Sequence, residues 1–312
     1  MWIVVSDMVA NGMTTESNQQ LRGVLKEHEM LSRHTSWRVG GEVKRFYQPA
    51  DIDDLTVFIA SLPADEKLYW IGLGSNLLVR DAGFDGTMIC TSGVLNGVEV
   101  LDRQRLYVEA GVACPKAAKV SAKHALAGAE FLCGIPGTMG GALAMNAGAF
   151  GGETWDVVES VQTVTRKGEL VAHTPDDFEV AYRHVSGPTQ EGEEWFVSCV
   201  LKLTTGDATE SQNKIKTLLN KRGASQPTQQ PNAGSVFRNP ENDYAARLIE
   251  SCGLKGTCLG GACVSDKHAN FIVNTGTASA TDIEDLINRV QKTVAEETGV
   301  ELQREVKIVG EQ

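Results

Sequence analysis

Two clusters of glycine constrain this chain more than any other feature of its sequence. Glycine supplies 32 of the 312 residues, a larger share than the roughly 7% usual in globular proteins. Many of these glycines gather in Gly72–Gly86 and Gly134–Glu153. Because glycine inside a helix or strand costs about 1 kcal/mol relative to alanine, the clusters predict irregular loops. In such loops the backbone approaches another segment or a ligand closely.

The first cluster begins with Gly72-Leu-Gly-Ser-Asn-Leu77, directly after a predicted strand. A dinucleotide fingerprint of the Rossmann type needs a third glycine where Leu77 stands, and a helix after it, so that fold is excluded. The lysine of a P-loop is also missing. The remaining backbone N–H groups, with the Ser75 and Asn76 side chains, suit a diphosphate. An ordinary turn with glycines at positive φ explains the same residues equally well.

The second cluster places seven glycines between Gly134 and Gly152, separated by small or apolar side chains. This density favours a backbone that is pressed against something flat, and a ring system is a natural candidate. A tightly packed internal turn is the alternative.

Composition excludes several classes of protein. The length favours two or three domains, and the net charge of −11 argues against a nucleic-acid or anionic-membrane partner. No apolar run approaches the roughly 20 residues of a membrane span, and residues 1–19 lack the basic start of a signal peptide. The seven cysteines show no C-x-x-C motif, and the six histidines show no metal-ligand spacing. We therefore expect buried reduced thiols, a cytoplasmic location and no metal; no oligomer is implied.

Apolar periodicity predicts mixed strands with few helices, an α+β fold rather than a doubly wound sheet. The clearest helix is Thr281–Glu297, with Thr281 and Glu284 as a capping box and Gly299 as its end. The other predicted helices are Ala50–Leu62 (capped by Asp51), Pro115–His124, Ala208–Arg222 and Asn242–Ser251. The predicted strands are Leu68–Ile71, Thr87–Cys90, Val98–Leu101, Leu106–Glu109, Val157–Thr165, Glu169–Ala172, Trp195–Leu203, Phe271–Asn274 and Val300–Val309.

Several long sequence blocks resemble the UDP-N-acetylenolpyruvoylglucosamine reductase (MurB) family, in the family's order and from about residue 20 to the end. The blocks are Thr35–Gly41, Gly72–Asp81, Gly134–Gly148, Tyr182-Arg183, Gly234–Pro240, Lys267–Asn274 and Glu305–Gly310. The compact segment after Arg183 resembles the shorter type II form.

The resemblance implies an FAD-binding fold of the vanillyl-alcohol-oxidase (PCMH) type in two subdomains, followed by an α+β substrate-binding domain. The implied division is an extension at 1–19, FAD-binding subdomains at 20–92 and 93–206, a substrate domain at 207–302 and a C-terminal strand at 303–312. The implied activity uses NADPH and non-covalent FAD to reduce the enolpyruvyl vinyl ether of UDP-N-acetylglucosamine-enolpyruvate to UDP-N-acetylmuramate.

The resemblance also assigns roles to single residues. Ser235 corresponds to the proton donor, Arg183 to the catalytic arginine, whose fork suits a carboxylate, and Glu305 to the acidic partner. Alternation along the last strand alone would make Glu305 a solvated carboxylate. The implied cofactor-binding residues are Arg38, Val39, Gly40, Gly72, Gly74, Ser75, Asn76, Leu77, Gly134, Pro136, Gly137, Gly140, Gly141, Asn146 and Gly148. The implied substrate-binding residues are Tyr182, Arg222, Gln226 and Asn239.

Two departures from the family pattern stand out. His184 and Val185 separate Arg183 from Ser186, which puts a role for Ser186 in doubt, and Arg304 precedes Glu305. Two other functions stay open, another flavin oxidoreductase on the same fold and a flavin or nucleotide-sugar binding protein without catalysis. The resemblance of the last hundred residues, with Ser235 and Glu305 in place, argues against the first. The presence of Arg183, Ser235 and Glu305 argues against the second.

Overall fold

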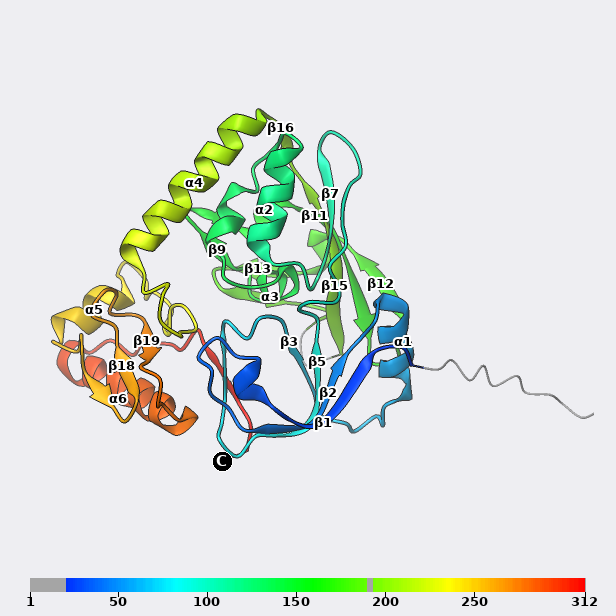
Figure 1. The fold of residues 1–312 in the computed structure, drawn as a ribbon. Helices are drawn as coiled ribbons and strands as arrows, with labels where there is room; N and C mark the ends of the chain where they lie inside the picture. The colour runs from blue at the N-terminus through cyan, green and yellow to red at the C-terminus, as the bar shows by residue number, and fades with distance from the viewer. Residues whose placement is uncertain (1–20, 190–192, 312) are drawn as a thin grey trace, which may run out of the picture.

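The computed structural model describes residues 21–189 and 193–311, and its first part is a four-stranded mixed sheet (Figure 1). The strand order is β1-β2-β5-β3; β1 and β2 are antiparallel, while β5 runs parallel to both of its neighbours. The elements are β1 Val24–Met30, β2 Glu42–Gln48, α1 Ile52–Ser61, β3 Leu68–Ile71, β4 Leu77–Val79 and β5 Phe84–Cys90. The Asp51 side chain caps α1 by accepting from the Asp54 N–H at 2.9 Å, as predicted.

A five-stranded antiparallel sheet forms the second part, in the order β12-β11-β15-β7-β6. Helices α2 and α4 lie against each other beside this sheet in Figure 1. The sheet and its main helices are β6 Val98–Val100, β7 Arg105–Glu109, α2 Cys114–Lys123, α3 Met139–Ala144, β11 Val158–Thr165, β12 Leu170–His173, β15 Glu194–Lys202 and α4 Ala208–Ser225. Short strands surround it: β8 Leu126–Ala127, β9 Gly148–Ala149, β10 Gly152–Glu153, β13 Glu179–Ala181, β14 His184–Ser186 and β16 Thr204–Thr205. The predicted strands Val157–Thr165 and Glu169–Ala172 are confirmed as β11 and β12, which pair with each other in antiparallel orientation.

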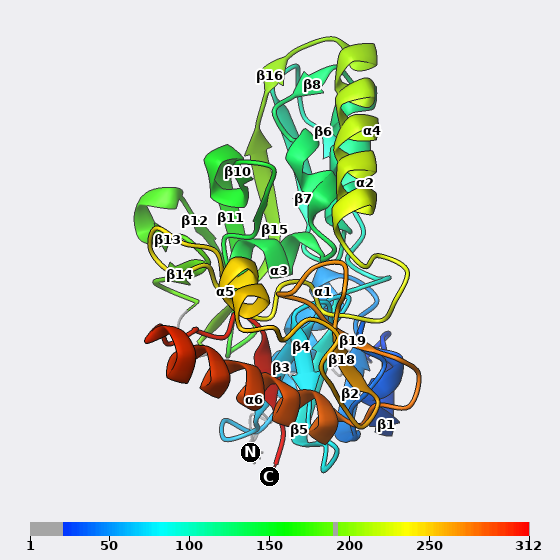
Figure 2. The ribbon, with the colours of Figure 1, turned by 90° about the vertical axis from the view of Figure 1, so that its left-hand side faces the viewer.

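The third part is a small sheet, β17-β18-β19, packed against a long helix (Figure 2). Its elements are α5 Ala245–Ser251, β17 Cys258–Leu259, β18 Ala262–Val264, β19 Ile272–Asn274 and α6 Ala280–Thr298. The chain then returns to the first part, where β20 Lys307–Val309 pairs in parallel with β4. The predicted strand from Val300 is therefore wrong over most of its length. Four short 3-10 helices complete the part of the chain that the structure describes: η1 Leu31–Arg33, η2 Glu130–Gly134, η3 Thr154–Val157 and η4 Pro175–Asp177.

The start of α6 corrects the predicted capping box. Ser279 is the N-cap, and its side chain and that of Asp282 accept each other's backbone N–H groups. Thr281 and Glu284 instead contact the first part of the chain through Asp81 and Arg80. Gly299 ends the helix in the left-handed conformation, with φ 73°, as predicted.

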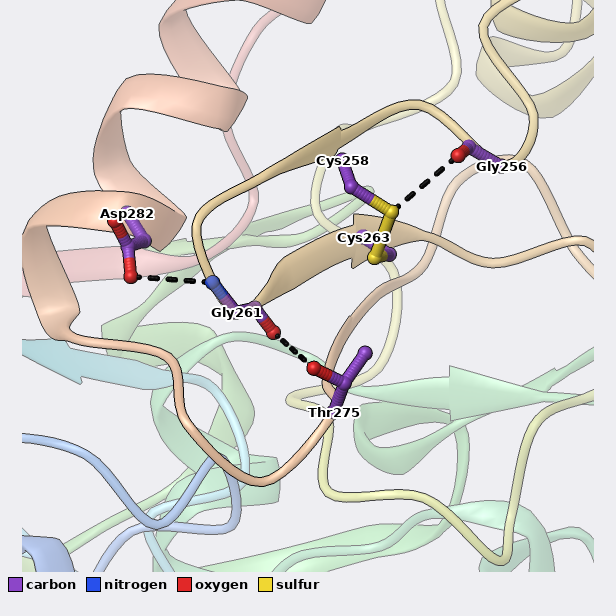
Figure 3. The surroundings of a disulfide bond; sticks show 6 residues. All are labelled: Gly256, Cys258, Gly261, Cys263, Thr275 and Asp282. Atoms are coloured by element: carbon purple, nitrogen blue, oxygen red, sulfur yellow. Dashed lines mark hydrogen bonds between the residues drawn. A yellow bond between two sulfur atoms is a disulfide. The ribbon is translucent and has the colours of Figure 1, made fainter.

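The cysteines also differ in part from the expectation. Cys258 and Cys263 form a disulfide, because β17 and β18 place them directly opposite each other with their Cα atoms 4.1 Å apart (Figure 3). The expectation of reduced thiols is wrong for this pair. The other five are free: Cys90, Cys114, Cys133 and Cys199 are buried, and Cys252 is half-buried. The predicted extension at 1–19 lies outside the described residues, and the domain boundaries stay a prediction.

Candidate active site

The two glycine clusters meet at one cavity of about 470 Å³. Its wall includes the loop Gly72–Leu77, part of Gly134–Ala149, and the three residues with implied catalytic roles, Arg183, Ser235 and Glu305. These segments are distant in sequence. The fold brings them together because β4 follows the first glycine loop directly and pairs with β20, which starts two residues after Glu305.

The first glycine loop presents unused backbone donors. None of the N–H groups from Gly72 to Asn76 donates a hydrogen bond to another residue within 21–189 or 193–311. Across from this loop, Gly137 and Gly141 line the cavity, and added Cβ atoms there would meet only side chains, at 3.4 Å or more. A side chain at either position would fill cavity space, so this lining fits the FAD diphosphate and ring system.

Other glycines in both clusters have structural reasons. A Cβ at Gly134 would lie 2.4 Å from the Phe150 ring, and one at Gly140 would lie 2.9 Å from Ala110. At Gly74, where φ is +58°, a Cβ would lie 2.3 Å from the carbonyl oxygen of His34. The packed-turn explanation therefore holds for these glycines, and the ring contact stays a prediction for Gly137 and Gly141. An added Cβ would likewise clash with Thr138 Oγ1 at Gly72 and with the Gly152 carbonyl oxygen at Gly148.

Arg183 is held at the tip of a two-residue turn between β13 and β14, where its φ is 55°. Its Nε lies 3.1 Å from Glu305 Oε1, and its terminal nitrogens donate to the carbonyls of Asn146 at 3.3 Å and Gly148 at 3.1 Å. Both side chains of the ion pair are mostly buried, with 16% and 12% exposed. A guanidinium has five N–H donors, so at least two remain for a ligand.

Glu305 links the other two candidate residues. Its side chain pairs with Arg183, and its backbone N–H donates to the carbonyl of Val236, next to Ser235, at 2.8 Å. Burial raises the pKa of the Glu305 carboxyl above its usual range, and the nearby Arg183 offsets this only in part. The solvated carboxylate suggested by strand alternation is therefore wrong, because this segment is irregular before β20 and faces the cavity.

Ser235 lies in an irregular loop that is fixed on both sides. The Gly234 N–H donates to Asn232 Oδ1 at 3.0 Å, and Gly234 has the positive φ of 75°. After the serine, the Val236 N–H donates to the Asn270 carbonyl at 2.9 Å. The Ser235 hydroxyl has no partner among the described residues, so it is free to bond to a ligand in the cavity.

The remaining predicted site residues divide into two groups. Arg222 and Gln226 line the cavity and bond to each other at 3.0 Å, from Nε to Oε1. Tyr182, Asn239, Asn146, Val39, Gly40, Arg38 and Gly140 do not line this cavity. Asn146 is buried and bonds to Glu153, Ala181 and Trp155, so its side chain organises the loop behind Arg183. Asn239 accepts from the Ala245 N–H at the start of α5.

Sequence reasoning missed how Asn76 is used, and it did not single out several residues of the cavity wall. The Asn76 amide donates to the Glu305 carbonyl at 3.2 Å, so it joins the first glycine loop to the acidic residue. Met145, Phe271 and Lys307 also line the cavity. Each lies inside or beside a quoted family block, but nothing in its own pattern marks it as a wall residue. Ser186, whose role was in doubt, is buried and bonds to Glu179 within the β13–β14 hairpin.

Within 21–189 and 193–311, no group of three or more His, Cys, Asp or Glu side chains is arranged to hold a metal ion. No helix in the same ranges combines the length and the apolar character that a bilayer crossing requires.

Comparison with known proteins agrees with this geometry. A family model described as an FAD binding domain matches residues 43–174, and the UDP-N-acetylenolpyruvoylglucosamine reductase C-terminal domain matches residues 226–309. The chain is 57% identical to the Methylococcus capsulatus UDP-N-acetylenolpyruvoylglucosamine reductase, covering 93% of this chain and 94% of that protein. It is 54% identical to the Legionella pneumophila (strain Corby) enzyme, covering 97% and 98%. The crystal structure of the Thermus caldophilus enzyme superposes with a TM-score of 0.76 at 30% identity, covering 93% and 99%.

Proposed function

The chain belongs to the UDP-N-acetylenolpyruvoylglucosamine reductase family, and from this we propose that NADPH is its hydride donor and Ser235 its proton donor. It is an FAD-dependent oxidoreductase of peptidoglycan precursor synthesis, with an FAD-binding fold of the vanillyl-alcohol-oxidase type. Its substrate is UDP-N-acetylglucosamine-enolpyruvate, which it reduces to UDP-N-acetylmuramate. The cytoplasm is the proposed location, since NADPH and nucleotide sugars are found there.

The chemistry requires a hydride, a proton and stabilisation of charge between the two additions. FAD held along the two glycine loops would supply the hydride, taken from NADPH, that the methylene carbon of the enolpyruvyl group receives. The adjacent carbon then carries negative charge that is shared with its carboxylate. Arg183 has N–H donors left for that carboxylate, and preorganised donors of this kind stabilise developing charge. The Ser235 hydroxyl protonates the carbon.

Glu305 completes this arrangement. Burial raises its pKa, so this carboxyl group takes up a proton more readily than an exposed glutamate does; in the protonated form it donates a hydrogen bond to the substrate carboxylate instead of repelling it. Its contact with Arg183 fixes the direction in which the guanidinium points. The single observation that carries the proposal is that Arg183, Ser235 and Glu305 line one cavity with the unused N–H groups of the first glycine loop.

One visible spectrum, followed anaerobically, tests the proposal. We expect the flavin absorbance of the purified protein to bleach on addition of NADPH and to return on addition of UDP-N-acetylglucosamine-enolpyruvate. NADH at the same concentration is the matched control for the donor, and UDP-N-acetylglucosamine is the control for the acceptor. Bleaching by NADPH without recovery of the flavin absorbance would refute UDP-N-acetylglucosamine-enolpyruvate as the acceptor. Flavin absorbance that stays unchanged after addition of NADPH would refute NADPH as the hydride donor.

A further inference from the structure

The positive charge of this chain is unevenly distributed. Residues 110–129 and 211–225, which contain α2 and most of α4, hold seven Lys and Arg residues and no Asp or Glu. The whole chain has a net charge of −11, so the remainder is more acidic still. Because the two helices pack against each other (Figure 1), they form one basic surface on an acidic molecule.

Six exposed lysines make up this basic surface: Lys116, Lys119 and Lys123 on α2, and Lys214, Lys216 and Lys221 on α4. The three on α2 lie at positions i, i+3 and i+7, along the side of the helix opposite its buried alanines. Lys214 pairs with the buried Glu130 at 3.2 Å, and Lys116 donates to the Asn96 carbonyl at 3.2 Å. The other four ammonium groups form no hydrogen bond or ion pair within 21–189 or 193–311. Their charges therefore remain available to attract anions.

The basic surface begins at the cavity that holds Ser235. At the start of α2, the Cys114 N–H donates at 2.9 Å to the carbonyl of Gly137, which lines the cavity, and Lys116 follows two residues later. Near the end of α4, Arg222 lines the cavity and Lys221 directly precedes it. The lysines therefore extend along both helices from the cavity wall outward.

The ligands of the proposed function are polyanions. NADPH and UDP-N-acetylglucosamine-enolpyruvate each carry a diphosphate, to which the first adds a phosphate and the second a carboxylate. An acidic molecule repels such ligands over most of its surface, whereas positive charge beside a cavity raises the local concentration of anions and their association rate.

We propose that the basic surface of α2 and α4 guides these nucleotides to the cavity and does not contact them once they are bound. The identity of the ligands rests on the proposed function. The inference concerns the arrival of the ligands, because the six lysines lie outside the cavity wall. A charge that acts only on approach changes the association rate and its dependence on salt, while the dissociation rate stays the same.

The test compares two double variants that remove the same charge. Lys119→Gln/Lys221→Gln acts on the basic surface near the cavity. The control is Lys167→Gln/Lys292→Gln, at exposed positions in the β11–β12 turn and on α6 that do not border the cavity. Stopped-flow absorbance of the oxidised, FAD-loaded enzyme follows binding of UDP-N-acetylglucosamine-enolpyruvate without turnover, because no hydride donor is added.

We expect the association rate constant of the basic-surface variant to be about 2–5-fold below that of the control at about 0.01 M salt, where charges act over about 30 Å. At about 1 M salt the two rate constants should be equal, and the dissociation rate constants should agree at both concentrations. Equal association at low salt would overturn the inference. Faster dissociation would also overturn it, because the lysines would then contact the bound ligand. The spectral test of the proposed function uses the wild type only, so the two can fail separately.

Discussion

At the scale of single residues, Ser235 is positioned by the hydrogen bonds that the backbone N–H groups of Gly234 and Val236 donate on either side of it. Its own hydroxyl has no partner among the described residues and therefore does not help to hold the loop. Ser235→Ala should therefore leave the loop, the FAD and the reduction by NADPH intact. Reoxidation of the flavin by the enolpyruvyl substrate should become about 10²–10⁴-fold slower, the usual worth of a positioned acid. Stopped-flow absorbance separates the two half-reactions.

The control for this experiment is Ser251→Ala. The Ser251 hydroxyl donates to the Leu248 carbonyl within α5, and Ser251 does not border the cavity. Both half-reactions should proceed at the wild-type rate in that variant. If Ser235→Ala also reoxidised at the wild-type rate, a different group would have to donate the proton.

Glu305 gives a prediction for stability against pH. Burial raises the folded-state pKa of its carboxyl above the unfolded value, so the folded protein binds the proton more tightly. This contribution to stability is fully present below the unfolded pKa and is lost as pH rises through the folded pKa. Glu305→Gln keeps an acceptor for Arg183 and does not titrate. Its free energy of unfolding, relative to that of the wild type, should therefore increase between pH 4.5 and 8 in urea titrations with excess FAD. A constant difference across that range would show that the Glu305 pKa is not raised.

At the scale of elements, the start of α6 is attached to the loop after β4 by two neighbouring residues. Asp81 accepts from the N–H groups of Ala280 and Thr281 at 3.0 and 2.9 Å, and from Thr281 Oγ1 at 2.8 Å. Arg80 makes two bonds of 2.9 Å to Glu284. Asp81→Ala removes a carboxylate from a helix N-terminus and should lower the free energy of unfolding by about 1–2 kcal/mol.

The matched control for Asp81 is Asp85→Ala. Among the residues that the structure describes, Asp85 pairs only with Lys44, and both side chains are more than half exposed. Surface pairs of this kind contribute little, so its free energy of unfolding should stay within about 0.5 kcal/mol of the wild type. Equal effects of the two substitutions would show that Asp81 does not hold α6.

The same helix shows what sequence patterns can and cannot predict. Its apolar stripe and its Gly299 end were visible because both depend on local sequence. Its true N-cap could not be predicted, because Thr281 and Glu284 fit a capping box equally well. In the structure these two side chains bond to Asp81 and Arg80 instead. In the site, the glycine loops and the catalytic residues could be found in the sequence through the family blocks. The Asn76–Glu305 contact could not, since it joins segments that lie far apart in the chain.

At the scale of the whole molecule, the first and third parts share one hydrophobic cluster. Trp37, Val39 and Leu78 from the first part pack in it with residues of α5, α6 and the third sheet. The Trp37 side chain is fully buried, and the Asn274 amide donates back to the Trp37 carbonyl at 2.9 Å. Ser235 and Glu305 lie in segments on the third-part side of this hydrophobic cluster. Their position in the cavity therefore depends on the contact between the first and third parts.

Trp37→Ala should therefore do more than lower stability. Truncating a buried tryptophan costs about 3–5 kcal/mol, and here the loss falls on the contact between two parts that each keep their own sheet. We expect calorimetry to show two transitions in place of one, with release of flavin, followed by its fluorescence, in the earlier one. Trp37→Phe keeps most of the ring and loses only the bond to the Ile272 carbonyl, so it should unfold in one transition at a lower temperature. A single transition for Trp37→Ala, with flavin released at the same temperature, would show that the two parts unfold together without this contact.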